Sequence, residues 1–566
     1  MVRSMKNGTI KKMQKSLIAG SLAVAMIMGG VAGSGISFGS VKAAGIEVGT
    51  YESKLPVIYI ETEGGANIVS KDYYIDATMT MQGNDEFNDG LYSGVIEIKG
   101  RGNSTWGMPK KPYKIKLDKS TNIWGMGKNK HWVLLANYSD PSLMRNTISY
   151  NLSGDMGMPQ MDTTWVDVVL NGKYVGNYQF CEQIRIAKDR VNIYDWETAG
   201  EDAADAIAEA EGFTKADKKE LEGYMSENLA WTTSKEVTFN GTTYQVEDYC
   251  EIEDISGGYL LELDEYYDEI SKFKTDKNQP LMFKKPEFAN TNKDMMNFVQ
   301  NYIQGFEDAV YSDNFYAAYN GKDVHYSELF DMDSLVDYWI VNEVFYNEEF
   351  NKKSTYLYKD IDGLFHMGPI WDMDYSSGGE GDTYITNQWA TKAFNTNAQT
   401  YMWYKQLIED PYFMMRVQER YWEIRDTLLE DIIKTGGKID TAYEYIYESA
   451  KKNEAMWKYK NGFDGGVNTF KTWLKTHLAW MDIQLETEDS FVRSLNAYNA
   501  SKNISMQASD ENGALKVDNI SKHAAADAVI EDGKDMTLSV SINQQDIVDA
   551  AVYVNGTYCK KAELND

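Results

Sequence analysis

Cysteine and histidine are both scarce in this chain. Its 566 residues include three cysteines, Cys181, Cys250 and Cys559, and five histidines. Three scattered cysteines are too few for a disulfide framework or a zinc cluster. The histidines show neither HxxxH nor HExxH spacing, which argues against a zinc hydrolase.

Positive charge is in short supply as well. The chain has 56 Lys and Arg against 86 Asp and Glu, which gives a formal net charge of −30 at pH 7. So acidic a protein repels nucleic acid and anionic lipid overall. We therefore expect no nucleic-acid partner.

Outside the first 43 residues, no apolar run is long enough to cross a bilayer. Within them, basic residues from Arg3 to Lys15 precede an apolar, small-residue stretch from Leu17 to Val31, and Val41-Lys42-Ala43 supplies a small-residue exit. This order is typical of a secretory signal peptide. We expect residues 1–43 to be removed and the mature chain, without a transmembrane segment, to be secreted or held at the cell surface.

The remaining chain is amply globular, with 43% hydrophobic and 13% aromatic residues. From residue 45 to about 195, short alternating or β-branched runs predict strands. They are Leu55–Ile60, Ser93–Lys99, Tyr113–Leu117, Trp165–Leu170 and Tyr174–Phe180, the last two joined by a tight Asn171-Gly172 turn. Helical spacing between Ser142 and Ser153 predicts a helix among them.

The later chain is mostly helical in pattern. Residues 197–248 read as an acidic helical insertion with a small hairpin at Asn240-Gly241. From Asp331 onward, apolar residues recur on one helical face, and long amphipathic patterns cover residues 401–434, 439–458 and 467–498. Residues 499–566 turn polar and then strand-like, which predicts a small C-terminal β-module cut short at Asp566. The fold class is therefore α+β, with a domain over 45–498 and a cleft expected between its β-rich and helical halves.

Two carboxylates mark the first candidate site. Asp372 and Asp374 lie in Gly368-Pro369-Ile370-Trp371-Asp372-Met373-Asp374-Tyr375, a strand-like segment bounded by turn residues. Hard cations such as Mg²⁺ take oxygen ligands, so this spacing suits a divalent metal. A polar turn is the alternative.

A basic loop provides the second candidate. Arg101 stands in a glycine-bearing loop between two predicted strands, and Lys110, Lys111, Lys114 and Lys116 follow it. Exposed backbone N–H groups with Lys and Arg suit a polyphosphate. Met108-Pro109 replaces the Lys-Ser/Thr of a Walker loop, and an ordinary hairpin is the alternative.

Two further acidic residues complete the set. Glu182 ends an otherwise apolar strand, where a carboxylate needs a cationic partner. That partner is a lysine of the 110–116 cluster or, in a purely structural role, Arg185 or Arg190. Glu349 follows a predicted helix and precedes a predicted strand hairpin around Asp360-Ile361-Asp362-Gly363. It either joins a metal–phosphate site or belongs to a solvated helix end.

Taken in order, these segments resemble the spore-coat-protein-H (CotH) kinase family over roughly residues 55–385. The chain carries the following motifs in turn: Gly100-Arg101-Gly102-Asn103-Ser104, Pro109-Lys110-Lys111-Pro112-Tyr113-Lys114-Ile115-Lys116, Arg145-Asn146, Asn171–Tyr178 with Glu182, Gly257-Gly258-Tyr259-Leu260-Leu261-Glu262, Ser354–Asp360 and Gly368–Asp374. The resemblance implies a divergent protein-kinase-like fold, ATP with Mg²⁺ or Mn²⁺, and phosphorylation of Ser or Thr on a coat or other extracytoplasmic protein.

The resemblance also implies roles for individual residues. Asp372 matches the metal-binding aspartate, with Asp374 in support. Glu182 matches the acidic partner of the nucleotide lysine, which is Lys111, Lys114 or Lys116, and Arg101 joins them in binding phosphate. Glu349 stands where the family has its catalytic aspartate. Its extra methylene shifts the carboxylate, and a misplacement of about 1 Å can cost about 10²-fold in rate.

The first hypothesis is therefore a secreted, ATP- and Mg²⁺-dependent protein kinase. The second is a non-catalytic surface or scaffold module that binds a cell-wall or polysaccharide partner through aromatic side chains. A third is a glycoside hydrolase with Asp372 paired to Glu349 or Glu182.

Overall fold

The computed structural model describes residues 52–379, 383–459 and 461–486, and the strands of residues 505–510, 513–515, 536–541, 551–554 and 557–561. The predicted signal peptide, residues 1–43, lies outside the described residues. The architecture is mixed α/β, with a β-rich N-terminal half and a helical C-terminal half. No helix in the described part of the chain is long and apolar enough to cross a membrane.

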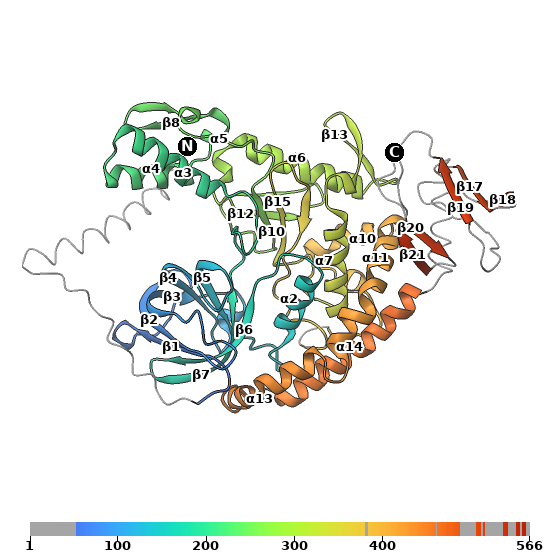
Figure 1. The fold of residues 1–566 in the computed structure, drawn as a ribbon, viewed down its shortest axis with the longest axis horizontal. Coiled ribbons are helices and arrows are strands. Elements are labelled where there is room, and N and C mark those ends of the chain that lie inside the picture. The colour runs from blue at the N-terminus through green and yellow to red at the C-terminus, as the bar shows by residue number, and fades with distance from the viewer. Residues whose placement is uncertain are drawn as a thin grey trace, which may run out of the picture. The chain divides into compact units, whose positions relative to one another are not determined.

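Seven strands of the N-terminal half close into a barrel in the order β1-β2-β3-β4-β5-β7-β6 (Figure 1). The strands are β1 (Val57–Thr62), β2 (Ile75–Gln82), β3 (Ser93–Gly100), β4 (Tyr113–Asn122), β5 (Lys128–Leu135), β6 (Thr163–Leu170) and β7 (Lys173–Glu182). Parallel pairing of β1 with β6, Val57 opposite Asp167, completes the closure. The interior is apolar because alternate side chains, such as Ile96 and Ile98 of β3, point inward.

Five strands predicted from the sequence are thus present, with the β6–β7 hairpin turning at Asn171-Gly172. The helix predicted over 142–153 is α2 (Arg145–Asp155). It begins three residues later than expected because Leu143 has φ 60°, which a right-handed helix does not allow.

Residues 196–248 form α3 (Trp196–Glu211), α4 (Lys215–Glu227), α5 (Trp231–Ser234) and the hairpin β8 (Glu236–Phe239)–β9 (Thr242–Gln245). The predicted hairpin at Asn240-Gly241 is therefore present. A second sheet follows in the order β11-β12-β10-β15-β16. Its strands are β10 (Tyr259–Leu263), β11 (Lys272–Lys274), β12 (Pro280–Lys285), β15 (Thr355–Lys359) and β16 (Phe365–Met367).

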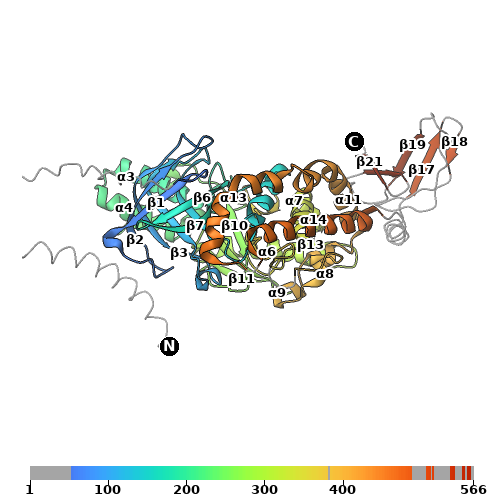
Figure 2. The same cartoon turned by 90° about the horizontal axis from the view of Figure 1, so that it is seen from below.

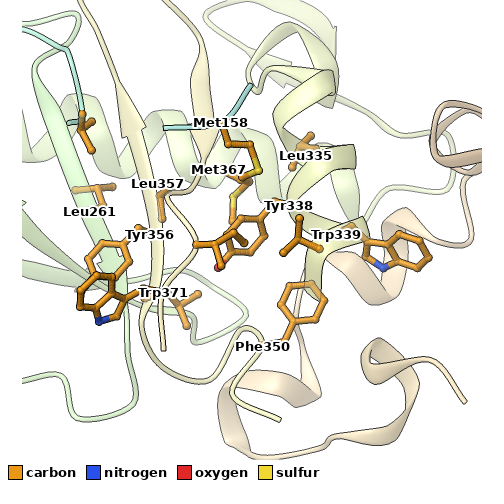
Figure 3. Close-up of a cluster of buried hydrophobic side chains, with 14 of the residues drawn as sticks. Met158, Leu261, Leu335, Tyr338, Trp339, Phe350, Tyr356, Leu357, Met367 and Trp371 are labelled. Atoms are coloured by element: carbon orange, nitrogen blue, oxygen red, sulfur yellow. The ribbon is translucent and has the colours of Figure 1, made fainter. Parts of the chain in front are cut away.

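The helical half contains α6 (Lys293–Val310), α7 (Met332–Phe345), α11 (Pro411–Ile424), α13 (Lys438–Trp457) and α14 (Gly462–Glu486), with the short hairpin β13 (Tyr316–Tyr319)–β14 (Lys322–His325) after α6. The sequence predicts one apolar face for α7, but every residue from Ser334 to Phe345 is buried. Figure 3 shows Tyr338 of α7 beside Met367 of β16, with Leu357 of β15 close by.

The long pattern over 401–434 is not one helix. It divides into α10 (Tyr404–Leu407), α11, a π-helical turn (Arg425–Leu429) and α12 (Glu430–Ile433), while α8 (Ala390–Ala393) and α9 (Asn397–Thr400) precede it. The break before α11 has a local cause, since Asp410 caps the helix and Pro411 occupies its first position.

The barrel is tied to α13. Asn177 of β7 donates a hydrogen bond from Nδ2 to Ser449 Oγ at 2.9 Å, and its backbone N–H donates to Asn453 Oδ1 at 3.2 Å. Figure 2 shows α13 beside β7. Beyond residue 486, five strands are described, β17 (Ser505–Asp510), β18 (Gly513–Leu515), β19 (Met536–Ser541), β20 (Ala551–Val554) and β21 (Thr557–Lys561), within the range predicted as a β-module.

Candidate functional site

One cavity of about 640 Å³ brings together residues from the barrel and from the second half of the chain. Strands β3, β4 and β5 line it on one side, and strands β10, β12 and β15 with the 368–374 segment line it on the other. The charged side chains around it are Lys71, Asp72, Lys99, Arg101, Lys114, Glu262, Asp264, Asp268, Glu269, Lys284, Glu349, Lys353, Asp372 and Asp374. Of the eight site residues predicted from the sequence, five lie here.

A cationic wall, which we define as Lys99, Arg101 and Lys114, occupies the barrel side. Lys99 and Lys114 are directly opposite each other on β3 and β4. Among the described residues, neither Arg101 nor Lys114 has an acidic partner within ion-pair distance. Burial, together with the neighbouring cations Lys99, Arg185, Arg101 and Lys284, lowers the pKa of Lys114 to about 8. Cations gathered without a counter-ion are suited to an anionic ligand.

The other predicted lysines do not line this cavity. Lys111 Nζ donates a hydrogen bond to the Trp106 carbonyl at 2.6 Å. Lys116 forms an ion pair with Glu97, at 2.5 Å, on the half-exposed barrel surface. Lys110 is fully buried and donates to the carbonyl oxygens of Ala136 and Asn177.

The loop after β3 folds tightly at the mouth of the cavity. Gly102 has φ 79°, and a Cβ there would lie 2.1 Å from Thr105 Oγ1, so only glycine fits. Lys71 Nζ donates to Gly102 O at 3.3 Å and to Asn103 Oδ1 at 2.7 Å. The loop therefore has a defined conformation beside the cationic wall.

A carboxylate wall, which we define as Glu349, Asp372 and Asp374, faces the cavity from the second half. The segment carrying the two aspartates was expected to be strand-like, but β16 ends at Met367 and residues 368–373 are irregular. Asp372 has φ 59°, which is outside the β region. Two hydrogen bonds fix this backbone: Asp372 N–H donates to Tyr150 Oη at 3.2 Å and Met373 N–H to Asn146 Oδ1 at 2.7 Å.

Within the carboxylate wall, Glu349 pairs with Lys353, but Asp372 and Asp374 have no ion-pair partner among the described residues. Burial raises the pKa of Asp374 well above its usual value, and the charges of Asp372, Glu349 and Asp140 add to the effect. Burial also raises the pKa of Asp372, against the opposing influence of Arg101 and Lys353. Asp374 is 6% exposed, and no ion pair joins either aspartate to another described residue.

These aspartates fit a divalent cation that is shared with a ligand. Within the described residues, no three His, Cys, Asp or Glu side chains are arranged to hold a metal ion by themselves. Mg²⁺ in phosphate-handling sites is commonly bound through one or two carboxylates, with substrate phosphates and water as the other ligands. Asp372 and Asp374 supply such carboxylate oxygens, without cationic partners, opposite the cationic wall.

Glu349 lies just beyond α7, whose end is set by Tyr346 at φ 51°. Its backbone N–H donates to Asn347 Oδ1 at 3.0 Å, and its Oε1 lies 3.5 Å from Lys353 Nζ. Burial raises the pKa of Glu349 to about 7, and Asp372 contributes, while Lys353 and Lys352 oppose the shift. A carboxylate in this condition can accept a proton near neutral pH.

Glu182 lies outside the cavity and pairs with an arginine. Arg190 Nε donates to Glu182 Oε1 at 2.7 Å, and both side chains are 1% exposed. Glu182 Oε2 also accepts from the Asp162 N–H at 2.9 Å. The sequence left two alternatives for the partner of Glu182, a lysine of the 110–116 cluster or an arginine in a structural role. The structure shows the second, with Arg190 as the partner.

Sequence reasoning missed a second Lys–Glu arrangement within the cavity. Lys284 of β12 lies 3.0 Å from Glu262 and 2.5 Å from Glu269. Tyr356 Oη donates to Glu262 Oε1 at 2.7 Å. The available signal was Glu262 itself, the single carboxylate in the apolar strand β10.

Comparison with known protein families gives a match to the CotH kinase protein family over residues 98–481. The matched range contains all eight predicted site residues and both walls of the cavity. No curated protein matches the chain.

Proposed function

The chain belongs to the CotH kinase protein family, and on that premise we propose that it transfers the γ-phosphate of ATP to a Ser or Thr hydroxyl of an exported protein. One observation carries the proposal. A single cavity holds Arg101 and Lys114, which have no acidic ion-pair partner among the described residues, on one wall, and Asp372 and Asp374, which have no cationic ion-pair partner among them, on the other. A nucleotide triphosphate with a divalent cation satisfies both walls at once, and phosphoryl transfer depends mainly on such positioning and charge stabilisation.

Lys99, Arg101 and Lys114 bind the phosphate oxygens in this proposal. Of the three candidate nucleotide lysines, Lys114 is the one whose side chain lines the cavity. Lys111 and Lys116 are held by Trp106 and Glu97, and Glu182 is paired with Arg190, so these three stabilise the barrel instead.

Asp372 and Asp374 would hold Mg²⁺ or Mn²⁺. When bound, the cation supplies neutralisation of the phosphate charge. Glu349 accepts the proton of the substrate hydroxyl while that oxygen forms a bond to the γ-phosphorus and the bond from phosphorus to the β–γ bridging oxygen breaks, releasing ADP. Lys353, 3.5 Å from Glu349 Oε1, lies close enough to orient this carboxylate.

A divergent kinase-like arrangement is part of the same proposal, with the barrel supplying the phosphate side and the later chain the acidic side. Secretion rests on the pattern of the first 43 residues. A glycoside hydrolase would not use the cationic wall, because paired carboxylates alone perform that reaction. The binding-module alternative does not need the carboxylate wall, and experiment separates it from the kinase.

The test is incubation of the chain lacking residues 1–43 with γ-labelled ATP, Mg²⁺ or Mn²⁺ and candidate exported proteins, next to an Asp372→Ala variant. Labelled protein is expected with the unchanged chain, and a loss of about 10²-fold or more in rate with the variant. Asp313→Ala, which removes an exposed carboxylate elsewhere, serves as the control. Absence of both label and thermal stabilisation by nucleotide would favour a binding module.

A further inference from the structure

Arg145 and Asn146 of α2 lie next to the carboxylate wall, and Asn146 also lines the cavity. They belong to the motifs identified in the sequence. Both are buried, with 1% and 4% of their surface exposed. Helix α2 itself is anchored by Asp140, whose Oδ2 accepts from the N–H groups of Met144 and Arg145, each at 2.9 Å.

Asn146 is the centre of a chain of amide hydrogen bonds. Its Oδ1 accepts from Met373 N–H, between the two aspartates, and its Nδ2 donates to Asn137 Oδ1 at 3.1 Å. Asn137 Nδ2 donates in turn to Gln179 Oε1, on barrel strand β7, at 3.0 Å. The amide chain, Asn146–Asn137–Gln179, therefore connects the aspartate segment to the barrel that carries the cationic wall.

Further contacts hold the same segment from α2. Arg145 Nε donates to Ser376 O at 2.9 Å and its Nη2 to Ser377 O at 3.2 Å. Tyr150, one turn further along the helix, accepts from Asp372 N–H. Backbone groups on both sides of Asp374 are thus fixed to a single helix.

Asn137 adopts φ 45°, a left-handed conformation that is uncommon for a residue with a side chain. Such conformations persist where the surroundings impose them, and they cluster at functional sites. Here the conformation accompanies an amide that bridges α2 and the barrel.

We propose that Asn146 is a positioning residue, which sets the position of Asp372 and Asp374 relative to the cationic wall through this amide chain. The inference rests on the proposed function. Residues that orient metal-binding side chains typically affect metal affinity by about 10- to 100-fold when they are removed. Loss of Asn146 leaves Met373 N–H and Asn137 Oδ1 without their partner, so the aspartate segment can shift from its position.

The same helix offers a matched control. Asn151 Oδ1 accepts from Gln160 Nε2 at 3.0 Å, an amide pair of similar length that does not involve the aspartate segment. The experiment measures Mn²⁺ affinity by calorimetry at saturating ATP for the unchanged chain, Asn146→Ala and Asn151→Ala. We expect affinity about 10- to 100-fold weaker in Asn146→Ala and unchanged affinity in Asn151→Ala. Binding of ATP in EDTA, which uses the cationic wall, should be equal in all three.

A second variant covers the case in which Asn146→Ala does not fold. Asn137→Gly removes the middle amide, and glycine accepts the positive φ of that position. It should weaken Mn²⁺ binding in the same way. Unchanged Mn²⁺ affinity in the variants, or an equal loss in Asn151→Ala, would overturn the positioning role while leaving the proposed function intact. An unchanged chain that bound neither ATP nor Mn²⁺ would instead overturn the proposed function, and the positioning role with it.

Discussion

Two regions of the molecule bury carboxylates, the barrel around Glu182 and the cavity around Asp374. They differ in whether a cation lies close enough to compensate the negative charge. Glu182 has Arg190 at 2.7 Å and a backbone N–H on its other oxygen. Asp374 has no cation at ion-pair distance among the described residues, and burial together with three further acidic groups raises its pKa. A buried charge without a partner is costly, so Asp374 carries its charge at neutral pH only where a bound cation compensates it.

The lysines of the 110–116 segment repeat this contrast. Lys110 is enclosed and donates to two carbonyl groups, whereas Lys114, four residues later, lies in the cavity beside other cations. Charges satisfied by the protein maintain its structure, and charges left unsatisfied are available to bind something else. Three substitutions test this division.

The largest loss of stability is expected from a substitution of Glu182, which is paired with Arg190. Glu182→Gln keeps an acceptor for Asp162 N–H but leaves Arg190 buried without a counter-charge, which costs about 3–5 kcal/mol. Denaturant unfolding should show this loss. The surface pair Lys116–Glu97 is the control, since Glu97→Gln should cost no more than about 1 kcal/mol. Similar losses from both variants would show that burial does not distinguish the two pairs.

A smaller effect, on ATP affinity, is expected from a substitution of Lys114, which has no acidic ion-pair partner among the described residues. Lys114→Met should weaken ATP binding by about 10-fold or more, because a charged hydrogen bond contributes about 1.5–3 kcal/mol. Its stability should be maintained or increased, because repulsion from Lys99 and Arg101 is removed. Lys111→Met, outside the cavity, should leave ATP affinity unchanged. An equal loss of ATP affinity in Lys114→Met and Lys111→Met would show that a position in the cavity does not determine which lysine binds ATP.

A third effect is a pH dependence of stability at Lys110. Burial lowers its pKa to about 7, with Asp167 opposing, while the unfolded chain retains a pKa of about 10.4. Between these values the unfolded state binds more protons, so this group makes the free energy of unfolding rise with pH from about 7 to about 10. In Lys110→Met that contribution should disappear. Parallel stability curves for the two proteins would contradict the lowered pKa.

Local pattern identifies many elements of this fold but does not reveal how they close. Strands β1, β3, β4, β6 and β7 follow from short β-branched runs. Strand β5 was not predicted from the sequence, because it begins with the polar residues Lys128-Asn129-Lys130-His131. The pairing of β1 with β6 joins residues more than 100 positions apart, and no local signal specifies it.

The sequence predicted which types of residue form the site, but only some of the individual residues that it predicted lie there. Lys114 and Lys116 point to the same face of β4, because side chains alternate along a strand. Only Lys114 lies under the part of that face that the second half of the chain covers. Likewise, Arg190 reaches Glu182 through a loop whose path depends on tertiary structure. The sequence thus indicates which side chains are candidates, and the packing of distant segments decides among them.

Closure of the barrel also bears on how a protein substrate can approach. Many peptide-binding domains capture an extended segment by adding it to an exposed sheet edge. A closed barrel has no edge, so the sheet that carries Lys99 and Lys114 cannot accept another strand. Under the proposed function, the hydroxyl-bearing segment of a substrate enters through the mouth of the cavity without backbone pairing with the barrel, and side-chain contacts at that mouth help to decide which segments are accepted.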